Sequence, residues 1–282
     1  MNRRSFLQHL CIASAIAIPC NVFAAPKGDT TPSVPKQEQF DVHVKDYISK
    51  MSHFNSAHPD DIVLSGEDRT LLSESTAKIT RVMRTIGYGN FNLISVDQAF
   101  TYAQRYPKIG AFSNKEKEFL EKIFYYDAST LGFYGDKPIT TFTKTIPKRD
   151  VIKIRRSGHY LFREHSYDIW KEIKEALGTD VILTSGVRGV VKQFHLFLMK
   201  TQRNNGNLSL ASRSLAPPGY SFHGISDFDV GQRRYGVSNF TSRFTETRVF
   251  SKLSELGYLT LRYPRGNMLG VRYEPWHVKV TS

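Results

Sequence analysis

The stretch Pro217-Pro-Gly-Tyr-Ser-Phe-His-Gly-Ile-Ser-Asp-Phe-Asp-Val-Gly231 places one imidazole, His223, and one carboxylate, Asp229, on a short segment rich in turn residues. A second imidazole, His277, and a further carboxylate, Glu274, lie near the C-terminus in the run Glu-Pro-Trp-His. Catalytic zinc sites hold the metal with three protein ligands and leave a fourth position for water. A glutamate that does not bind the metal can act as the base for this water. The two segments therefore contain the residue types of a catalytic zinc site.

A third motif precedes them. The run 181–184, Val-Ile-Leu-Thr, is typical of a short buried strand, and it leads directly into Ser185-Gly-Val-Arg-Gly-Val-Val-Lys-Gln193. Arg188 is therefore predicted at the end of a strand, where binding sites are commonly built.

These three motifs, in this order over roughly residues 180–282, resemble the zinc D-alanyl-D-alanine carboxypeptidases of the hedgehog-like peptidoglycan metallopeptidases, which include the vancomycin-resistance-type D,D-carboxypeptidases. The resemblance implies Zn²⁺ bound by His223, Asp229 and His277. There is one departure, because the family's aspartate stands one position further from its histidine. The acidic ligand is therefore open between Asp229 and Asp227.

The resemblance also implies roles for the other motif residues. Glu274 would be the catalytic base, and Arg188 would stabilise the oxyanion or hold the terminal carboxylate of the substrate. Gln193 would orient Arg188 or the site loop, unless it is an ordinary helix-surface residue. Ser221 would bond a substrate carbonyl or cap its loop, and the sequence does not decide between these two.

The spacing of Glu274 and His277 adds a geometric constraint. On a regular strand, side chains three residues apart face opposite sides, so both could not approach one metal. A kink at Pro275, which cannot donate a ladder hydrogen bond, would let them converge. We therefore expect His277 to bind the metal and Glu274 to stand beside it.

The first residues indicate export. Arg3-Arg4 resembles a twin-arginine signal, an apolar run follows over 10–18, and Val22-Phe23-Ala24 offers a cleavage site. The run is too short for a permanent membrane span. We expect residues 1–24 to be an export signal and the mature protein to be periplasmic.

Both cysteines, Cys11 and Cys20, lie inside this signal. The mature chain would therefore have no disulfide, no cysteine nucleophile and no cysteine metal ligand. Histidine and carboxylate side chains would have to hold any metal.

The rest of the chain divides by pattern. Residues 25–39 are predicted to be a flexible linker, 40–150 a mostly helical region, and 151–282 the zinc peptidase domain. The fold class expected is α+β, with a small antiparallel sheet in the peptidase domain. Capping boxes at Ser95 and Ser113 predict two helix starts. In the C-terminal part we expect helices ending at Gly178 and over 190–203 and 244–256, a loop over 204–214, and strands over 258–262 and 271–280.

The charge balance indicates the kind of partner. Lys and Arg number 39 against 26 Asp and Glu, a formal net charge of +13, which favours attraction to a polyanion. No nucleic-acid-binding motif accompanies the charge, so an anionic cell wall is the better candidate partner.

The function expected is removal of the C-terminal D-Ala from peptidoglycan stem peptides. The alternatives are a peptidoglycan endopeptidase, an L,D-carboxypeptidase, or a zinc-containing wall-binding module without activity, because fold alone does not assign turnover. Glu274 and Arg188 favour an enzyme, since a structural zinc site needs neither. An exported polyanion-binding protein with incidental histidines would explain the charge, but not three ordered motifs.

Overall fold

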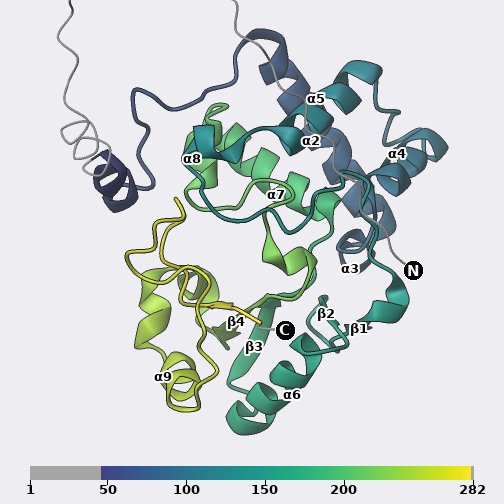
Figure 1. The fold of residues 1–282 in the computed structure, drawn as a ribbon. Coiled ribbons are helices and arrows are strands. Elements are labelled where there is room, and N and C mark those ends of the chain that lie inside the picture. The colour runs from purple at the N-terminus through teal and green to yellow at the C-terminus, as the bar shows by residue number, and fades with distance from the viewer. Residues whose placement is uncertain (1–45, 281–282) are drawn as a thin grey trace, which may run out of the picture. The chain divides into compact units, whose positions relative to one another are not determined.

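The computed structural model describes residues 46–280, which lie within one compact unit (Figure 1). The predicted export signal at 1–24 and the linker at 25–39 lie outside the described residues. None of the described helices is long and apolar enough to cross a membrane.

Helices form most of the first half. Ser95 and Ser113 each accept a hydrogen bond from the backbone N–H three residues on, and Gln98 and Glu116 return the bond, so both predicted capping boxes are confirmed. The helices are α2 (Gly66–Ile86), α3 (Tyr88–Phe91), α4 (Val96–Arg105) and α5 (Asn114–Tyr125), and later in the chain α6 (Ser166–Leu177), α7 (Val190–Arg203), α8 (Leu208–Ser212) and α9 (Arg248–Glu255). Short 3₁₀ turns are η1 (Ala128–Leu131), η2 (Lys148–Asp150), η3 (Phe222–Gly224), η4 (Gly236–Phe240) and η5 (Ser242–Glu246).

One apolar core joins α2, α4 and α5 to α7 (Figure 1). Its members from α2 and α7 are Leu72, Ile79, Val82, Met83, Val190, Val191, Phe194, Phe197 and Leu198. Because α7 follows residue 150 in the chain, this core contains residues from both sides of the predicted boundary. The boundary itself stays a prediction.

The sheets are small and antiparallel. Strands β3 (Val181–Ser185), β4 (Phe228–Gln232) and β5 (His277–Val278) form one sheet in that order, and β1 (Val151–Lys153) pairs with β2 (Tyr160–Phe162). A second apolar core lies between the larger sheet and helices α6 and α9. The predicted α+β class, with a small antiparallel sheet after a helical region, is confirmed.

Several predicted elements were wrong. Of the strands predicted over 258–262 and 271–280, the structure has β5 and one isolated bridge between Leu261 and Val278. The His277 N–H donates to the Glu274 carbonyl, so the chain turns at Pro275 and Trp276, inside the range where the second strand was predicted to run.

Capping side chains explain the other differences. The loop predicted over 204–214 contains α8, because Asn207 accepts a hydrogen bond from the Leu210 N–H and starts a helix. The helix predicted over 244–256 begins at Arg248, where Thr247 accepts from the Phe250 N–H. The residues before Thr247 form η5 instead.

Candidate metal centre

The sheet brings two candidate ligands to one face. Asp229 on β4 and His277 on β5 are directly opposite each other in the antiparallel register. Opposed residues in such a pair project to the same side of the sheet. His223, on η3, approaches from the loop before β4. Ligand atoms of these three buried residues lie within 4.8 Å of one another, as no other His, Cys, Asp or Glu trio does in residues 46–280.

The ring of His223 is fixed from behind. Its Nδ1 lies 2.8 Å from the carbonyl oxygen of Gly186, so this nitrogen carries the proton and donates. The lone pair of Nε2 then faces Asp229, whose Oδ1 is 3.2 Å away. The residue that provides this carbonyl has to be a glycine, because a β-carbon at position 186 would stand 2.0 Å from the Tyr160 carbonyl oxygen.

Whereas His223 is held through Nδ1, the ring of His277 is held through its other nitrogen, Nε2. Its Nε2 lies 2.9 Å from Oδ2 of Asp227, and its Nδ1 lies 3.4 Å from Oδ1 of Asp229. A histidine that donates one N–H to a carboxylate offers its other nitrogen to a metal. The donor atoms that converge are therefore His223 Nε2, His277 Nδ1 and Asp229 Oδ1.

Asp227 has its oxygens engaged elsewhere. Besides His277, it accepts hydrogen bonds from the Arg262 guanidinium and from the Val280 backbone N–H, 3.0 Å away. Burial alone would raise the pKa of Asp227, but the hydrogen bonds from His277 and Arg262 outweigh it and hold the pKa well below its usual range. Asp227 is therefore an ionised partner of the His277 ring, and Asp229 is the carboxylate in the cluster.

Glu274 stands next to the cluster. The His277 N–H donates to the Glu274 carbonyl at 3.2 Å, so Pro275 and Trp276 occupy the middle of a turn. The kink predicted at Pro275 is present, and it brings Oε2 of Glu274 to 3.6 Å from Nδ1 of His277. A carboxylate at this position can reach a water or substrate atom bound beside the three donor atoms.

Arg188 also points into this site. Its Nη2 donates to Oδ2 of Asp229, its Nε donates to the Ser185 hydroxyl at 2.8 Å, and its backbone N–H donates to the His223 carbonyl at 2.9 Å. In residues 46–280 its Nη1 has no hydrogen-bond partner. The guanidinium is thus oriented by protein contacts and keeps one nitrogen for a further acceptor.

Gln193 connects Arg188 to the loop before η3. Its Nε2 donates to the Arg188 carbonyl at 2.9 Å, and its Oε1 accepts from the Gly219 N–H at 2.8 Å. Both ends of this buried amide therefore bind backbone, which is the geometry of a positioning residue. The Ser221 side chain lies nearby, in the lining of the pocket that contains the cluster.

One pocket collects the predicted residues. Among its lining residues are Arg188, Gln193, Ser221, His223, Glu274 and His277, and apolar side chains complete the wall. Asp229 is buried next to this pocket, paired with Arg188 and His223.

Sequence reasoning missed two neighbours of the site. Arg262 holds Asp227, and its guanidinium carbon lies 3.4 Å from the centre of the Phe222 ring. Tyr263 is buried, with its ring centre 5.4 Å from that of His277. A lone arginine ending the apolar run 258–262 was the available signal, since a cation in such a run often has a buried acidic partner.

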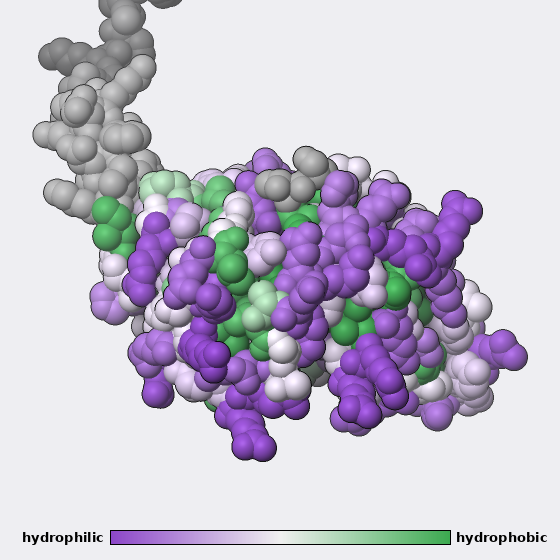
Figure 2. Space-filling model, turned by 90° about the horizontal axis from the view of Figure 1, so that it is seen from below, coloured by the Kyte–Doolittle hydropathy of each residue, from purple (hydrophilic) through white to green (hydrophobic). Residues whose placement is uncertain are grey.

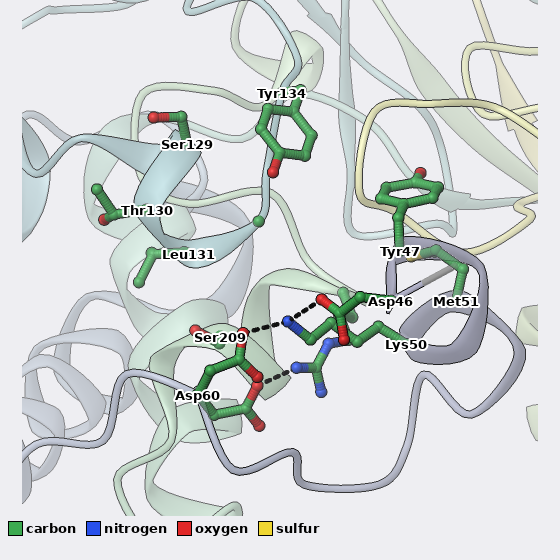
Figure 3. Close-up of a pocket in the computed structure, with 13 residues that line it drawn as sticks. Asp46, Tyr47, Lys50, Met51, Asp60, Ser129, Thr130, Leu131, Tyr134 and Ser209 are labelled. Atoms are coloured by element: carbon green, nitrogen blue, oxygen red, sulfur yellow. Dashed lines mark hydrogen bonds and ion pairs between the residues drawn. The ribbon is translucent and has the colours of Figure 1, made fainter. Parts of the chain in front are cut away.

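A different pocket lies between the helical turn at residues 46–52, η1 and α8. Lys50 is bonded there to Asp46, at 2.7 Å, and to Asp60, while Asp61 pairs with Arg213 (Figure 3). Each of these three carboxylates is paired with a cation, and no trio of metal-ligating groups converges in this pocket within residues 46–280.

The residues present fit a zinc ion. Two imidazole nitrogens and one carboxylate oxygen, each with a lone pair turned inward, are a common donor set for zinc that keeps an open coordination position. The outer hydrogen bonds to Gly186 and Asp227 fix both rings for this purpose.

The fold is α+β, and the cluster is a candidate metal site made of two histidines and one aspartate. Residues 165–281 match the family model described as VanY: D-alanyl-D-alanine carboxypeptidase. The resemblance found in the sequence is confirmed over these residues, so this part of the chain is similar to a family of peptidases.

Solved structures show more distant likenesses. They include the LdcB LD-carboxypeptidase, 22% identical with a TM-score of 0.40 over 48% of this chain and 68% of that one. VanYB in complex with D-alanine-D-alanine is 22% identical with a TM-score of 0.40, over 54% and 86%. The vancomycin-resistance D,D-dipeptidase VanXYg, in complex with a D-Ala-D-Ala phosphinate analogue, is 17% identical with a TM-score of 0.42, over 53% and 62%. No curated protein matches the chain.

Proposed function

We propose that this protein is a zinc-dependent peptidase of peptidoglycan stem peptides, and that it removes the C-terminal D-Ala as a D,D-carboxypeptidase. The observation that supports it most is the convergence of His223 Nε2, His277 Nδ1 and Asp229 Oδ1, with the Glu274 carboxylate 3.6 Å from His277. Zinc held by these atoms would supply a water of lowered pKa and a positive charge close to the scissile carbonyl.

The side chains of the pocket then divide the work. Glu274 takes a proton from the attacking water and returns it to the departing amine, which needs a carboxylate within hydrogen-bond reach of both. Arg188 donates from its guanidinium to negative charge on the substrate. That charge is the developing oxyanion or the terminal carboxylate of a substrate with a free C-terminus.

Two further residues keep Arg188 in place. Ser185 accepts a hydrogen bond from its Nε, and Gln193 donates to its carbonyl. We assign Gln193 to positioning of Arg188 and the 217–224 loop, and Ser221 to the substrate-facing wall of the pocket. Export to the periplasm, where the wall substrate lies, is part of the same proposal.

Defined muropeptides test this function. The purified protein loaded with zinc is incubated with stem pentapeptides, stem tetrapeptides and cross-linked dimers, and the products are identified by mass spectrometry. Loss of one D-Ala from the pentapeptide alone supports a D,D-carboxypeptidase. Loss from the tetrapeptide would indicate L,D specificity, and cleavage of the dimer would indicate an endopeptidase. Binding of zinc and wall without any product would leave only a binding module.

A further inference from the structure

A second site is suggested by the free edge of β3. Among the residues that the structure describes, this strand pairs with β4 alone, so its other side has no neighbouring strand. Val230, opposite Leu183, donates its N–H to the carbonyl of Trp276, the residue before β5, at 3.0 Å. Backbone groups alternate sides along an antiparallel strand, so Leu183 turns its N–H and C=O away from β4.

The same argument applies to Val181. Its opposite residue, Gln232, has both backbone groups bonded to the side chain of Asn239, so the backbone of Val181 also turns outward. The Val181 carbonyl accepts a hydrogen bond from Lys174 at 3.1 Å. In residues 46–280 the outward N–H and C=O of Leu183 have no partner. An open strand edge of this kind can accept another extended strand.

A groove runs beside this edge, and its lining is strongly basic. Lysines and arginines enter it from β1 and the β1–β2 turn, from α6 and from the end of β4, and none of the aspartates and glutamates in the described part of the chain lines it. The cations are Lys153, Arg155, Arg156, Lys171, Lys174 and Arg233.

Most of this charge is uncompensated. Of these cations only Lys171 has a carboxylate within ion-pair distance in the described residues, that of Asp168 at 2.8 Å. Burial, and next the charge of Arg233, lower the pKa of Lys174, as expected where like charges are crowded. A ligand with negative charge would therefore bind such a groove more favourably than a neutral or positive one.

The groove also has an apolar component. Tyr167 and Trp170 of α6 line it, together with Ile154 and the edge of β3. The ammonium of Lys171 lies 5.1 Å from the Tyr167 ring centre, which leaves one ring face covered by a cation. The face of the molecule toward α6 and α9 shows hydrophobic strips between hydrophilic side chains (Figure 2).

We propose that this groove binds an extended acidic segment of a partner protein, which adds as a strand to the edge of β3. Its backbone would bond to Leu183, its acidic side chains would pair with the cations, and apolar side chains between them would contact Tyr167 and Trp170. Alternation of acidic and apolar residues suits the two-residue period of a strand. The groove shares no lining residue with the metal pocket, so binding there does not depend on the catalytic assignment.

The open edge is what favours a protein segment over other anions. Lipid headgroups and wall polymers could satisfy the cations, but they lack the regular N–H and C=O spacing that pairs with Leu183.

The test uses a fluorescent peptide of alternating Glu and Val as the probe, titrated into the zinc-loaded protein. The R155E/R233E double variant should weaken binding at least tenfold. The matched control, K108E/K144E, makes the same charge change at exposed lysines outside the groove and should bind like the parent protein. Equal losses of peptide affinity in both double variants would show that net charge alone explains the binding, and would contradict the proposed site.

A second arm tests strand addition. The same peptide with alternate backbone nitrogens methylated keeps its charge but loses the N–H donors, and should bind at least tenfold more weakly. The parent peptide should also slow hydrogen exchange of the Leu183 N–H. Undiminished binding of the methylated peptide, or equal competition by anionic vesicles or purified peptidoglycan, would overturn the proposal. Activity on soluble stem peptides, measured on the same samples, is expected to be unchanged and reports on the catalytic site separately.

Discussion

Oδ2 of Asp227 lies 2.9 Å from Nε2 of His277, on the side of the ring that faces away from the other two candidate metal ligands. Oδ1 of Asp229, two residues further along, lies 3.4 Å from Nδ1 of the same ring. The ring is therefore held between two carboxylates that project to one side of an extended segment. The two aspartates therefore have different positions, Asp227 at Nε2 of His277 and Asp229 at Nδ1, although the sequence spacing did not distinguish them.

We expect Asp229→Ala to lose zinc, because it removes one of the three proposed ligands. Asp227→Ala should retain zinc with an affinity lowered about 10- to 100-fold, the usual effect of removing the partner of a metal-bound histidine. Metal content after gel filtration, followed by zinc titration of each variant, measures both. Zinc retained in the first variant and lost in the second would reverse the assignment.

Glu274→Gln should bind zinc normally and lose about 10²- to 10⁴-fold in kcat, because the amide keeps the size of the side chain but cannot accept the proton. The assay is release of D-Ala from a stem pentapeptide at matched zinc occupancy. Turnover within a few fold of the parent protein would exclude Glu274 as the base.

Arg188→Lys should lower kcat/KM. The expected loss of transition-state stabilisation is roughly 2–4 kcal/mol, the range found for one lost oxyanion donor. An ammonium keeps the charge but cannot bond Ser185, Asp229 and substrate at once in the planar arrangement of a guanidinium. Arg105→Lys, on the exposed surface of α4, is the control and should have no effect. Equal kinetics for the two variants would assign Arg188 to structure alone.

Gly186→Ala should destabilise the protein by about 1–3 kcal/mol, the usual cost of an overpacked position. The new β-carbon would stand 2.0 Å from the Tyr160 carbonyl oxygen, so the backbone that holds His223 would have to move. Zinc affinity should fall together with Tm. Gly89→Ala is the matched control, since its nearest contact would be an ordinary 3.7 Å. A normal Tm and normal zinc binding in Gly186→Ala would contradict this account.

The sequence predicted the parts of the site that depend on local pattern. Helix α7 begins and ends where the apolar spacing placed it, and the strand before Ser185 leads into Arg188 as expected. The turn at Pro275 followed from the chemistry of proline, because no regular strand could direct Glu274 and His277 to one place.

Other features depend on long-range partners that a local pattern does not contain. Arg262 pairs with Asp227 across 35 residues of chain, and the Gly186 carbonyl meets His223 across 37. The strand predicted over 258–262 failed for the same reason. Apolar and polar residues alternate adequately over 258–262 for a strand. The partner strand β5 is only two residues long, however, so in the described residues this segment forms a single bridge, between Leu261 and Val278.

The positions of the two histidines have a consequence for variation in chain length. A metal bound to both His223 and His277 closes a loop of 54 residues (277 − 223), which includes the exposed turns at 233–238. The entropy lost on closing a loop grows only with the logarithm of its length, about 0.6 kcal/mol for each doubling. Several residues inserted at those turns would therefore add little to the cost of closure. The metal centre should tolerate considerable lengthening of the chain between its own ligands.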